Sequence, residues 1–263
     1  MDKHPYQTWG DPDSPTTLFF QEQSGFRISV PGVAEFLISR TGEVESRASD
    51  AEAAGLWRVF YEQQIEPLLL SLRGSQVFHG GAIAVGGQAV AFLAPSGRGK
   101  STLTTAFARR GHPFLSDDCL LLDMAGAQVH ANPHANYVRL WEDSAAALGR
   151  GAAAYVAGSP KPRLAAGSSF PHCDRPLPLA RVYLLGEGGV DAPRIQMVSP
   201  SQQLIGWAAN AFVLDLKNPD VLRRNLVAGA RLVQEVPMRR LDYPRRYDAL
   251  DSVVDAVLAD VAG

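Results

Sequence analysis

The chain has 263 residues, of which 46% are hydrophobic and 20% are charged. This composition supplies enough apolar side chains for one large core or two smaller ones, so general disorder is not expected. Lysine and arginine total 25 against 27 aspartates and glutamates, and the net charge of -2 excludes a bulk positive field for holding nucleic acid.

The start of the chain and its two cysteines indicate the compartment. Met1–Pro5 leads into no apolar signal core, and no run approaches the roughly 18 apolar residues of a membrane span. Cys119 and Cys173 are too few for a disulfide framework and lack the paired spacing of a zinc site, which is typical of a reducing compartment. We therefore expect a cytoplasmic protein with neither a membrane segment nor a nucleic-acid partner.

The first strands are expected near residue 30. Phe26–Val30 alternates between apolar and polar side chains, and Ala34–Ser39 follows the turn formers Pro31 and Gly32. This pattern predicts a small antiparallel meander.

A helix is expected next, because apolar residues recur near helical spacing over Asp50–Leu72. Asp50 is its expected cap, Pro67 should kink or split it, and Gly74 should end it. We expect a small β-plus-helix unit over residues 1–75 and a second domain over residues 76–263.

Two apolar stretches begin the second domain. Val77–Val85 and Gln88–Leu93 are separated by Gly86 and Gly87, which suit the positive backbone angles of a tight hairpin. The second stretch runs directly into residues 94–101, so we expect a strand that leads into a loop.

A helix and a strand are predicted after this loop. Ser101–Arg110 has a helical pattern ended by Gly111, and Phe114–Met124 is a strand region that carries Asp117 and Asp118. Further along, the patterns predict one strand, three helices and one long loop rich in glycine, proline and alanine. These are strand Ala180–Leu185, helices Pro200–Phe212, Pro219–Gln234 and Tyr247–Val261, and loop 151–178.

The loop has the form of a phosphate-binding P-loop. Its glycines let successive backbone N–H groups surround phosphate oxygens, although Ala94 stands where the usual pattern has its first glycine. The pattern predicts that Lys100 neutralises the β- and γ-phosphates, that Ser101 binds magnesium and that the helix N-terminus faces the anion. A glycine turn before an ordinary helix is the alternative. The predicted nucleotide-binding residues are Pro95, Ser96, Gly97, Arg98, Gly99, Lys100, Ser101 and Thr102.

Asp117 and Asp118 stand directly before the apolar run Cys119–Leu122. Paired carboxylates here suit magnesium binding through water and acceptance of a proton from an attacking hydroxyl. Adjacent side chains of a strand point to opposite faces, so only one is expected to face the phosphate unless the backbone turns there. The alternative is that both acids are solvated in a turn.

Four separated elements resemble the catalytic core of bacterial HPr serine kinases, in that family's order and spacing. They are His79-Gly80, residues 94–101, Arg110-Gly111-His112 and Ser116-Asp117-Asp118. The resemblance implies an α/β fold like that of phosphoenolpyruvate carboxykinase, the cofactors ATP and Mg²⁺, and transfer of the γ-phosphoryl group to a protein serine. It also implies a homo-oligomer.

The same resemblance implies roles for three residues. Asp118 takes the position of the catalytic base, and Asp117 would organise the metal. His79 would orient an aspartate or a phosphate group, although a lone strand histidine is more often structural.

The chain departs from the sugar-regulating members of that family. Its N-terminal segment is short, and their glutamate-containing glycine motif after the aspartates is absent. Tyr137–Ser144 stands in its place, and this segment and Leu241–Tyr247 resemble the lasso-peptide tailoring kinases. Those enzymes phosphorylate a serine at the C-terminus of a precursor peptide, so the resemblance implies a substrate of that kind.

Other charged residues are candidates with alternatives. The Arg139 guanidinium, expected beside Asp143, suits a substrate carboxylate or phosphate, or else a surface ion pair. Lys161 and Arg163 suit a cationic clamp on the γ-phosphate, or else solvated loop charges.

Two arginine pairs and three histidines are further candidates. Arg239-Arg240 and Arg245-Arg246 suit a basic patch for an acidic peptide, or else caps for the last helix. Three histidines, taken together with Cys173, match no common zinc spacing, so we expect scattered histidines and no metal site among them. They are His130, His134 and His172.

We therefore predict an α/β P-loop kinase that uses ATP and Mg²⁺. The predicted metal ligands are Ser101 and Asp117, and the predicted catalytic residues are His79, Lys100, Asp117, Asp118 and Arg139. One alternative is a kinase for another protein or for a small metabolite, because the loop binds phosphate without identifying the acceptor. Another is a regulatory module that binds nucleotide without transfer, which the missing glutamate motif favours and the two aspartates disfavour.

Overall fold

The computed structural model describes residues 4–11, 13–51, 53–148, 155, 159, 161–166 and 170–263. The chain divides into two compact units. The first contains the described residues up to Gly74 together with Ser159, and the second contains those from Ser75 to Tyr155 and from Lys161 to Gly263. Each unit has its own sheet and its own buried side chains.

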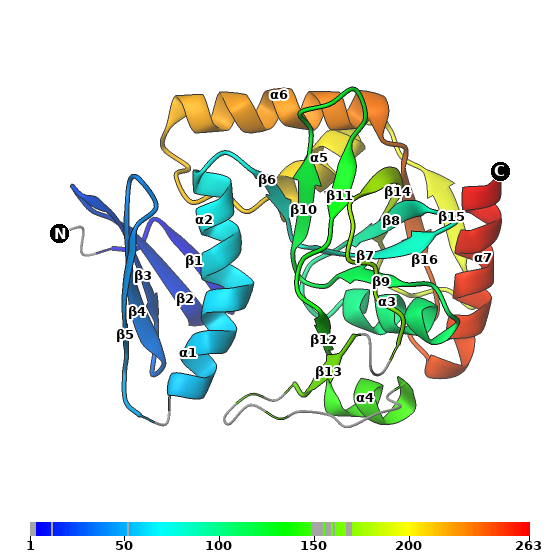
Figure 1. Ribbon diagram of the computed structural model, residues 1–263, viewed down its shortest axis with the longest axis horizontal. Helices are drawn as coiled ribbons and strands as arrows, with labels where there is room; N and C mark the ends of the chain where they lie inside the picture. Colours follow the sequence, from blue (N-terminus) through cyan, green and yellow to red (C-terminus); the bar gives the residue numbers. More distant parts are fainter. Residues whose placement is uncertain are drawn as a thin grey trace. The chain divides into compact units, whose positions relative to one another are not determined.

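The first unit is built on a five-stranded antiparallel meander (Figure 1). Its strands are β1 (Gln7–Asp11), β2 (Ser14–Gln21), β3 (Gly25–Val30), β4 (Ala34–Ser39) and β5 (Val44–Ala48), paired in chain order. The two strands predicted from sequence are confirmed as β3 and β4. In β3 the side chains of Phe26, Ile28 and Val30 are buried and those between them are partly exposed, as the alternation predicts.

A helical segment packs against this sheet. It consists of α1 (Ala54–Phe60), a π-helical turn η1 (Tyr61–Ile65) and α2 (Glu66–Leu72). The ring of Phe36 stacks on that of Trp57 with centroids 6.2 Å apart, and the Thr17 hydroxyl donates to Gln64 Oε1 at 3.0 Å. Aromatic packing and one partly buried hydrogen bond thus join the helix to the strands.

The ends and the interruption of this helix follow from individual residues. The predicted interruption at Pro67 is confirmed, because a π turn precedes α2, whose second residue is Pro67, and proline supplies no N–H to the helical ladder. The predicted cap is wrong. The N-cap position is Ala53, and the Asp50 carboxylate accepts a hydrogen bond from its N–H at 2.7 Å. Gly74, with a φ of 103°, follows the end of α2 as expected.

The second unit is built on a nine-stranded mixed sheet. Its strands are β6 (Gln76–Phe78), β7 (Gly80–Val85), β8 (Gln88–Leu93), β9 (Phe114–Ser116), β10 (Leu120–Asp123), β11 (His130–Asn132), β14 (Leu177–Leu185), β15 (Arg194–Met197) and β16 (Met238–Asp242). The order is β6-β10-β11-β14-β8-β7-β9, while β16 pairs with β14 and β15. β14 is parallel to β8 and to β16, and the other pairs are antiparallel. The predicted α/β class is confirmed.

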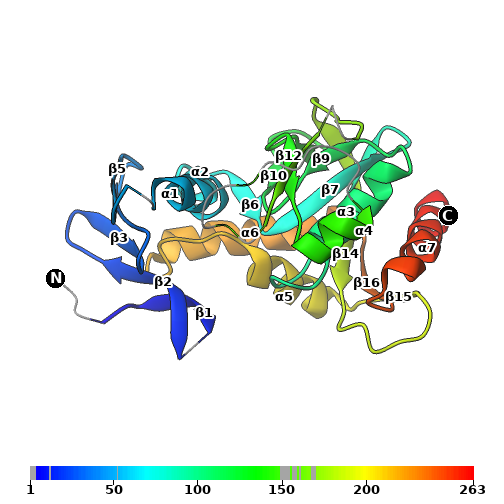
Figure 2. The ribbon, with the colours of Figure 1, turned by 90° about the horizontal axis from the view of Figure 1, so that it is seen from below.

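Helices cover both faces of this sheet. α3 (Lys100–Arg109) and α7 (Leu250–Ala262) pack on one face, and α5 (Pro200–Asn210) and α6 (Pro219–Glu235) pack on the other. Figure 1 shows β8 between α5 and α3, and Figure 2 shows β14 and β16 between α5 and α7. The sheet is therefore the middle of three layers.

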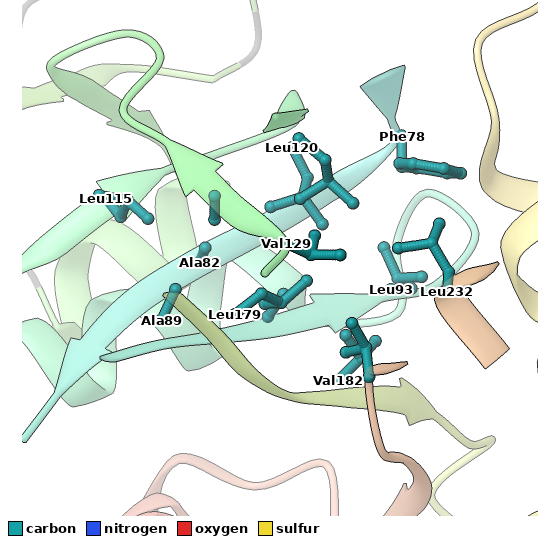
Figure 3. Packing of buried hydrophobic residues seen from close by; sticks show 14 of the residues in the cluster. Phe78, Ala82, Ala89, Leu93, Leu115, Leu120, Val129, Leu179, Val182 and Leu232 are labelled. Atoms are coloured by element: carbon teal, nitrogen blue, oxygen red, sulfur yellow. The ribbon is translucent and has the colours of Figure 1, made fainter. Parts of the chain in front are cut away.

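Strand β8 shows how the sequence produces these layers. Ala89 and Leu93 lie in the same cluster as Leu232 of α6 (Figure 3), whereas Val90 and Phe92 lie in the cluster that includes Phe107 of α3. Alternate side chains thus enter opposite cores. A strand buried on both faces has a continuous apolar sequence, which explains the run that leads into the loop.

Two predicted strands are wrong because each is broken at a residue of the candidate site. The stretch 77–85 divides at His79, since β6 pairs with β10 whereas β7 pairs with β8 and β9. The stretch 114–124 divides over residues 117–119, where Asp118 has a φ of 59°. Pairing with different neighbours, which is a tertiary property, decides both breaks.

The hairpin and the helices agree with the sequence. Gly86 and Gly87 have φ of 57° and 81° between paired Val85 and Gln88, and Gly111 follows α3 with a φ of 89°. The predicted strand over residues 180–185 is confirmed and begins earlier, in β14. Three further elements surround the site, together with the 3-10 turn that precedes α7. They are β12 (Tyr137–Arg139), α4 (Glu142–Leu148), β13 (Arg163–Ala165) and η2 (Tyr247–Ala249).

The predicted loop over residues 151–178 lies partly outside the described residues. In its described part, β13 pairs antiparallel with β12, and β14 begins at Leu177. This part of the prediction is therefore wrong, because a strand pair forms there.

Candidate functional site

Residues 94–99 join β8 to α3 and are called the glycine loop below. Gly97 and Gly99 have φ of 80° and 84°, a backbone region that glycine adopts readily. A Cβ at Gly99 would also lie 2.7 Å from the Tyr243 hydroxyl. Within the described residues, no side chain caps α3, which starts directly after Gly99. Its first N–H groups have no helical acceptor and are available to an anion.

Lys100 is the first residue of α3, and its side chain is only 4% exposed. Its Nζ donates to the carbonyl oxygens of Ala94 at 2.7 Å and Pro95 at 3.2 Å, and it lies 2.9 Å from His79 Nε2. His79 Nδ1 lies 3.2 Å from the backbone oxygen of Asp118. A neutral histidine that accepts from the lysine and donates to this carbonyl satisfies both contacts.

Burial governs the proton affinities of this pair. Burial lowers the pKa of Lys100 to about 8. Burial first, and then the charge of Lys100, lowers the pKa of His79 to about 4, so the histidine is neutral at physiological pH. An incoming anion would stabilise the lysine cation in this position.

Ser101 and Asp117 form the second contact of the site. The Ser101 hydroxyl donates to Asp117 Oδ1 at 2.9 Å, and the Arg139 N–H donates to Asp117 Oδ2 at 3.4 Å. Asp117 is 6% exposed. Burial first, and then the charge of Asp118, raises the pKa of Asp117 to about 7. A buried carboxylate held against a hydroxyl is a set of hard oxygen donors that fits Mg²⁺.

The left-handed backbone of Asp118 gives the two aspartates different contacts within one site. Asp117 contacts Ser101, whereas Asp118 lines the cavity described next. The sequence left open whether both acids lie at one site, and a φ of 59° at Asp118 provides the backbone turn that this requires.

A cavity of about 1070 Å³, called the loop cavity, opens above the N-terminus of α3. Its lining joins the glycine loop to segments that are distant in the chain. The lining residues are Ser96, Gly97, Arg98, Gly99, Lys100, Ser101, Thr102, Asp118, Arg139, Leu140, Trp141, Glu142, Asp143, Ser144, Lys161, Glu187, Tyr243, Arg245, Arg246, Tyr247 and Leu250. Three predicted site residues do not line the cavity themselves but contact residues that do. Pro95 and His79 contact Lys100, and Asp117 contacts Ser101.

One wall of the loop cavity is held by a chain of hydroxyl groups. Thr102 Oγ1 lies 3.2 Å from Ser144 Oγ, which lies 3.0 Å from the Tyr247 hydroxyl. That hydroxyl donates to Asp143 Oδ2 at 2.8 Å, and the Ser144 N–H donates to Asp143 Oδ1 at 2.8 Å. The wall thus connects α3, α4 and η2.

Another wall comes from the segments after β14 and β16. The Arg245 guanidinium lies 3.9 Å above the Tyr243 ring and donates to the carbonyl oxygen of Gly186 at 2.6 Å. Arg98 of the glycine loop forms an ion pair with Glu187 at 3.3 Å. Aromatic and charged groups therefore enclose the loop from this side.

The remaining predicted cations are separated by the structure. Lys161 lines the loop cavity, with its Nζ 4.9 Å from the ring centroid of Trp141, which is 50% exposed. The Arg163 guanidinium lies 4.3 Å from the ring centroid of Tyr137. Their role in clamping a phosphate stays a prediction.

The four predicted arginines do not form one patch. Arg239 pairs with Asp260 of α7 and Arg240 pairs with Asp242, whereas the other two line the loop cavity. Because β16 ends between these pairs, the chain separates them. Of the four arginines predicted to form a patch, only Arg245 and Arg246 therefore lie at the loop cavity.

Sequence reasoning assigned no role to Ser144, Glu187, Tyr243 or Tyr247, which line the loop cavity. Three of them lie in the two segments that carry the lasso-kinase resemblance, Tyr137–Ser144 and Leu241–Tyr247. That resemblance was the available signal. Glu187 had none.

The number of possible metal ligands bears on what the site can hold. In the described part of the chain, no three or more histidine, cysteine, aspartate or glutamate side chains gather to hold a metal ion. A magnesium ion would therefore depend on Ser101, Asp117 and oxygens of a bound phosphate.

None of the helices in the described ranges combines the length and apolar character that crossing a bilayer demands.

Comparison with known proteins finds a likeness to solved structures. No family model matches the chain. No curated protein matches it. The structure of the Hpr(Ser) kinase/phosphatase from Coxiella burnetii is similar with a TM-score of 0.37 and 12% sequence identity, over 72% of this chain and 99% of that chain. A likeness at this TM-score carries no argument about activity, which therefore depends on the chemistry of the site itself.

Proposed function

We propose that this protein is a magnesium-ATP-dependent kinase that transfers the γ-phosphoryl group to a serine hydroxyl of a peptide. The observation that carries the proposal is the convergence of the glycine loop, Lys100, the Ser101–Asp117 pair and Asp118 around one cavity. Backbone N–H groups, a lysine, hard oxygen donors and a separate carboxylate are the groups that phosphoryl transfer needs.

Each group has a distinct task in the proposed reaction. The N–H groups of the glycine loop and Lys100 hold the phosphate chain, and Ser101 and Asp117 hold the magnesium ion. Bound magnesium supplies positive charge to the phosphate oxygens. Asp118 lines the cavity and is the proposed base.

The transfer step balances with these groups. The acceptor oxygen forms a bond to the γ-phosphorus while the bond from that phosphorus to the β–γ bridging oxygen breaks. The proton of the acceptor hydroxyl goes to the carboxylate of Asp118, and ADP leaves with the bridging oxygen. Lys100, within the same cavity, would stabilise the negative charge on the phosphate oxygens.

The proposed acceptor is a serine at the C-terminus of a lasso-peptide precursor, and its support is the sequence resemblance of Tyr137–Ser144 and Leu241–Tyr247. Both segments contribute to the wall of the loop cavity, where an acceptor would approach. The cavity also carries cationic groups, which suit the carboxylate at the C-terminus of such a peptide. They are Arg139, Lys161 and Arg246.

The test is transfer of label from ATP labelled in its γ-phosphate. Candidate acceptors are a lasso-peptide precursor with a C-terminal serine, other serine peptides and small hydroxyl metabolites. Lys100→Ala should reduce transfer by about a hundredfold or more, because it removes the buried cation next to the phosphates. Lys217→Ala is the matched control, since Lys217 is exposed and does not line the loop cavity.

The outcomes separate the proposal from its alternatives. Transfer to the precursor peptide alone supports the full proposal, whereas transfer to another acceptor keeps the kinase and replaces the substrate. ATP binding without transfer to any acceptor would identify a regulatory module. Undiminished transfer by Lys100→Ala would contradict the role given to the glycine loop.

A further inference from the structure

The carboxylate of Asp143 is held in a defined orientation inside the loop cavity. One of its oxygens accepts from the Tyr247 hydroxyl and the other accepts from the Ser144 N–H, each at 2.8 Å. The hydrogen bond from Tyr247, followed by that from Ser144, lowers the pKa of Asp143, so the group stays ionised. Each oxygen of a carboxylate has capacity for more than one donor. The group can therefore accept further hydrogen bonds.

The place of this carboxylate follows from the helix that begins at the glycine loop. Thr102 is the third residue of α3, and its hydroxyl lies 3.2 Å from Ser144 Oγ, next to Asp143. In a phosphate-binding loop, the lysine reaches the β- and γ-phosphates while backbone N–H groups hold the α- and β-phosphates. The nucleoside therefore extends away from the Lys100 end, and the wall beyond Thr102 is available to it.

The charge of Asp143 selects what that wall can bind. A carboxylate repels phosphate oxygens and accepts hydrogen bonds from neutral hydroxyl groups, and the two neighbouring hydroxyls of ribose offer two such donors. An acidic side chain takes this part in dinucleotide-binding folds. Three other carboxylates line the cavity and have different surroundings: Glu187 pairs with Arg98, Asp118 follows Asp117 of the phosphate end, and Glu142 is the first residue of α4.

We infer that Asp143, oriented by Tyr247, accepts hydrogen bonds from the ribose hydroxyls of the bound nucleotide. The inference rests on the proposed function and adds a nucleoside subsite to it. It makes the protein selective for ribonucleotides over deoxyribonucleotides. A purely structural role for Asp143, as a tie between α4 and η2, predicts no such selectivity.

The experiment is a set of calorimetric titrations in the presence of Mg²⁺. The ligands are ATP, 2′-deoxy-ATP, 3′-deoxy-ATP and tripolyphosphate, and the proteins are the parent chain, Asp143→Asn and Tyr247→Phe. The parent should bind ATP about tenfold or more tightly than at least one deoxy analogue, the scale of a hydrogen bond to a charged group. Asp143→Asn should bring that ratio close to one and leave tripolyphosphate affinity unchanged.

Two further variants sharpen the assignment. Tyr247→Phe keeps the ring and removes the hydroxyl that orients the carboxylate, so it should lower the same ratio by a smaller factor. Asp251→Asn is the matched control, because Asp251 is an exposed acid in the first turn of α7 and does not line the loop cavity. It should keep the parent's ratio.

The possible results differ for the two proposals. Failure of the parent chain to bind ATP and tripolyphosphate overturns the proposed function and this inference with it. Binding of both ligands without preference for ribose overturns the inference alone. A ratio that is unchanged in Asp143→Asn, or an equal loss of ATP and tripolyphosphate affinity, identifies a structural role and also overturns it.

Discussion

Two clusters of charged and polar side chains lie in the second unit. They differ in which groups contact the charged side chains. The loop cluster consists of His79, Lys100, Ser101 and Asp117, and the Asp260 cluster consists of Arg181, Tyr183, Arg239 and Asp260. The first lies at the loop cavity, and no member of the second lines that cavity.

In the Asp260 cluster, opposite charges are in direct contact. Asp260 accepts from the Tyr183 hydroxyl at 2.6 Å and pairs with Arg181 at 2.8 Å and with Arg239 at 3.2 Å. These contacts join α7 to β14 and β16. Each arginine is paired with the shared carboxylate of Asp260, so the expected role of the cluster is structural.

In the loop cluster, neutral groups hold the charges. Lys100 donates to two backbone carbonyl oxygens, and Asp117 accepts from a hydroxyl and from a backbone N–H. Burial lowers the pKa of the first and raises that of the second, so each charged form is disfavoured. The difference between the clusters indicates where a charged ligand would be stabilised, and it predicts different effects of substitution.

The largest expected effect concerns Asp118, the proposed base. Asp118→Asn keeps the size of the side chain and cannot accept a proton, so transfer should fall by about a hundredfold or more while ATP still binds. A phosphopeptide assay and a calorimetric ATP titration measure the two quantities. Asp123→Asn, at the exposed end of β10, is the control. Loss of ATP binding would make Asp118 a metal ligand instead, and preserved transfer would exclude both roles.

The next effect concerns the Asp260 cluster and should appear in stability. Asp260→Asn leaves two arginines without their carboxylate, and because the group is partly exposed we expect a loss of about 2 kcal/mol in the free energy of unfolding. Asp255→Asn on the same helix breaks an exposed pair with Arg110 and should change it by less than about 0.5 kcal/mol. Denaturant unfolding measures both. A larger effect on transfer than on stability would contradict the structural role.

A smaller effect is expected for the metal ligands. Ser101→Ala removes a proposed ligand and keeps the backbone amides, so the magnesium concentration for half-maximal transfer should rise by about tenfold. Asp117→Asn should also raise the magnesium concentration for half-maximal transfer. Ser101→Thr retains the hydroxyl and should restore the parent's value, and a magnesium titration that is unchanged in Ser101→Ala would exclude this ligand.

The smallest effect is a pH dependence of stability without ligand. The pKa of Lys100 is lowered to about 8 in the folded chain, so between that pH and the unfolded value of 10.5 the unfolded state binds more protons. Stability should therefore rise with pH in this window, by about 1 kcal/mol from pH 8 to pH 9. Lys100→Met should lack this contribution. Equal slopes of unfolding free energy in both proteins would show that the lysine retains its ordinary pKa.

Much of the fold could be predicted because its signals are local. The alternation in Phe26–Val30, the paired glycines after Val85 and the strand–loop–helix around residues 94–101 each depend on neighbours in the chain. Other strands could not be predicted. β5 has no fully buried side chain, so its sequence carries no apolar alternation. Nothing local ends β6 at His79, because the break depends on which strand each side pairs with.

The sequence by itself determined the strand–loop–helix segment and identified Lys100, Ser101 and the two aspartates as candidates, since residue type and spacing decide these over a few positions. Only the tertiary structure decided the wall of the loop cavity. Tyr247 meets Asp143 across 104 positions of the chain, and Arg98 meets Glu187 across 89. Such contacts arise when helices and strands pack, and no local pattern encodes them. The proposed ribose subsite therefore depends on the folded chain.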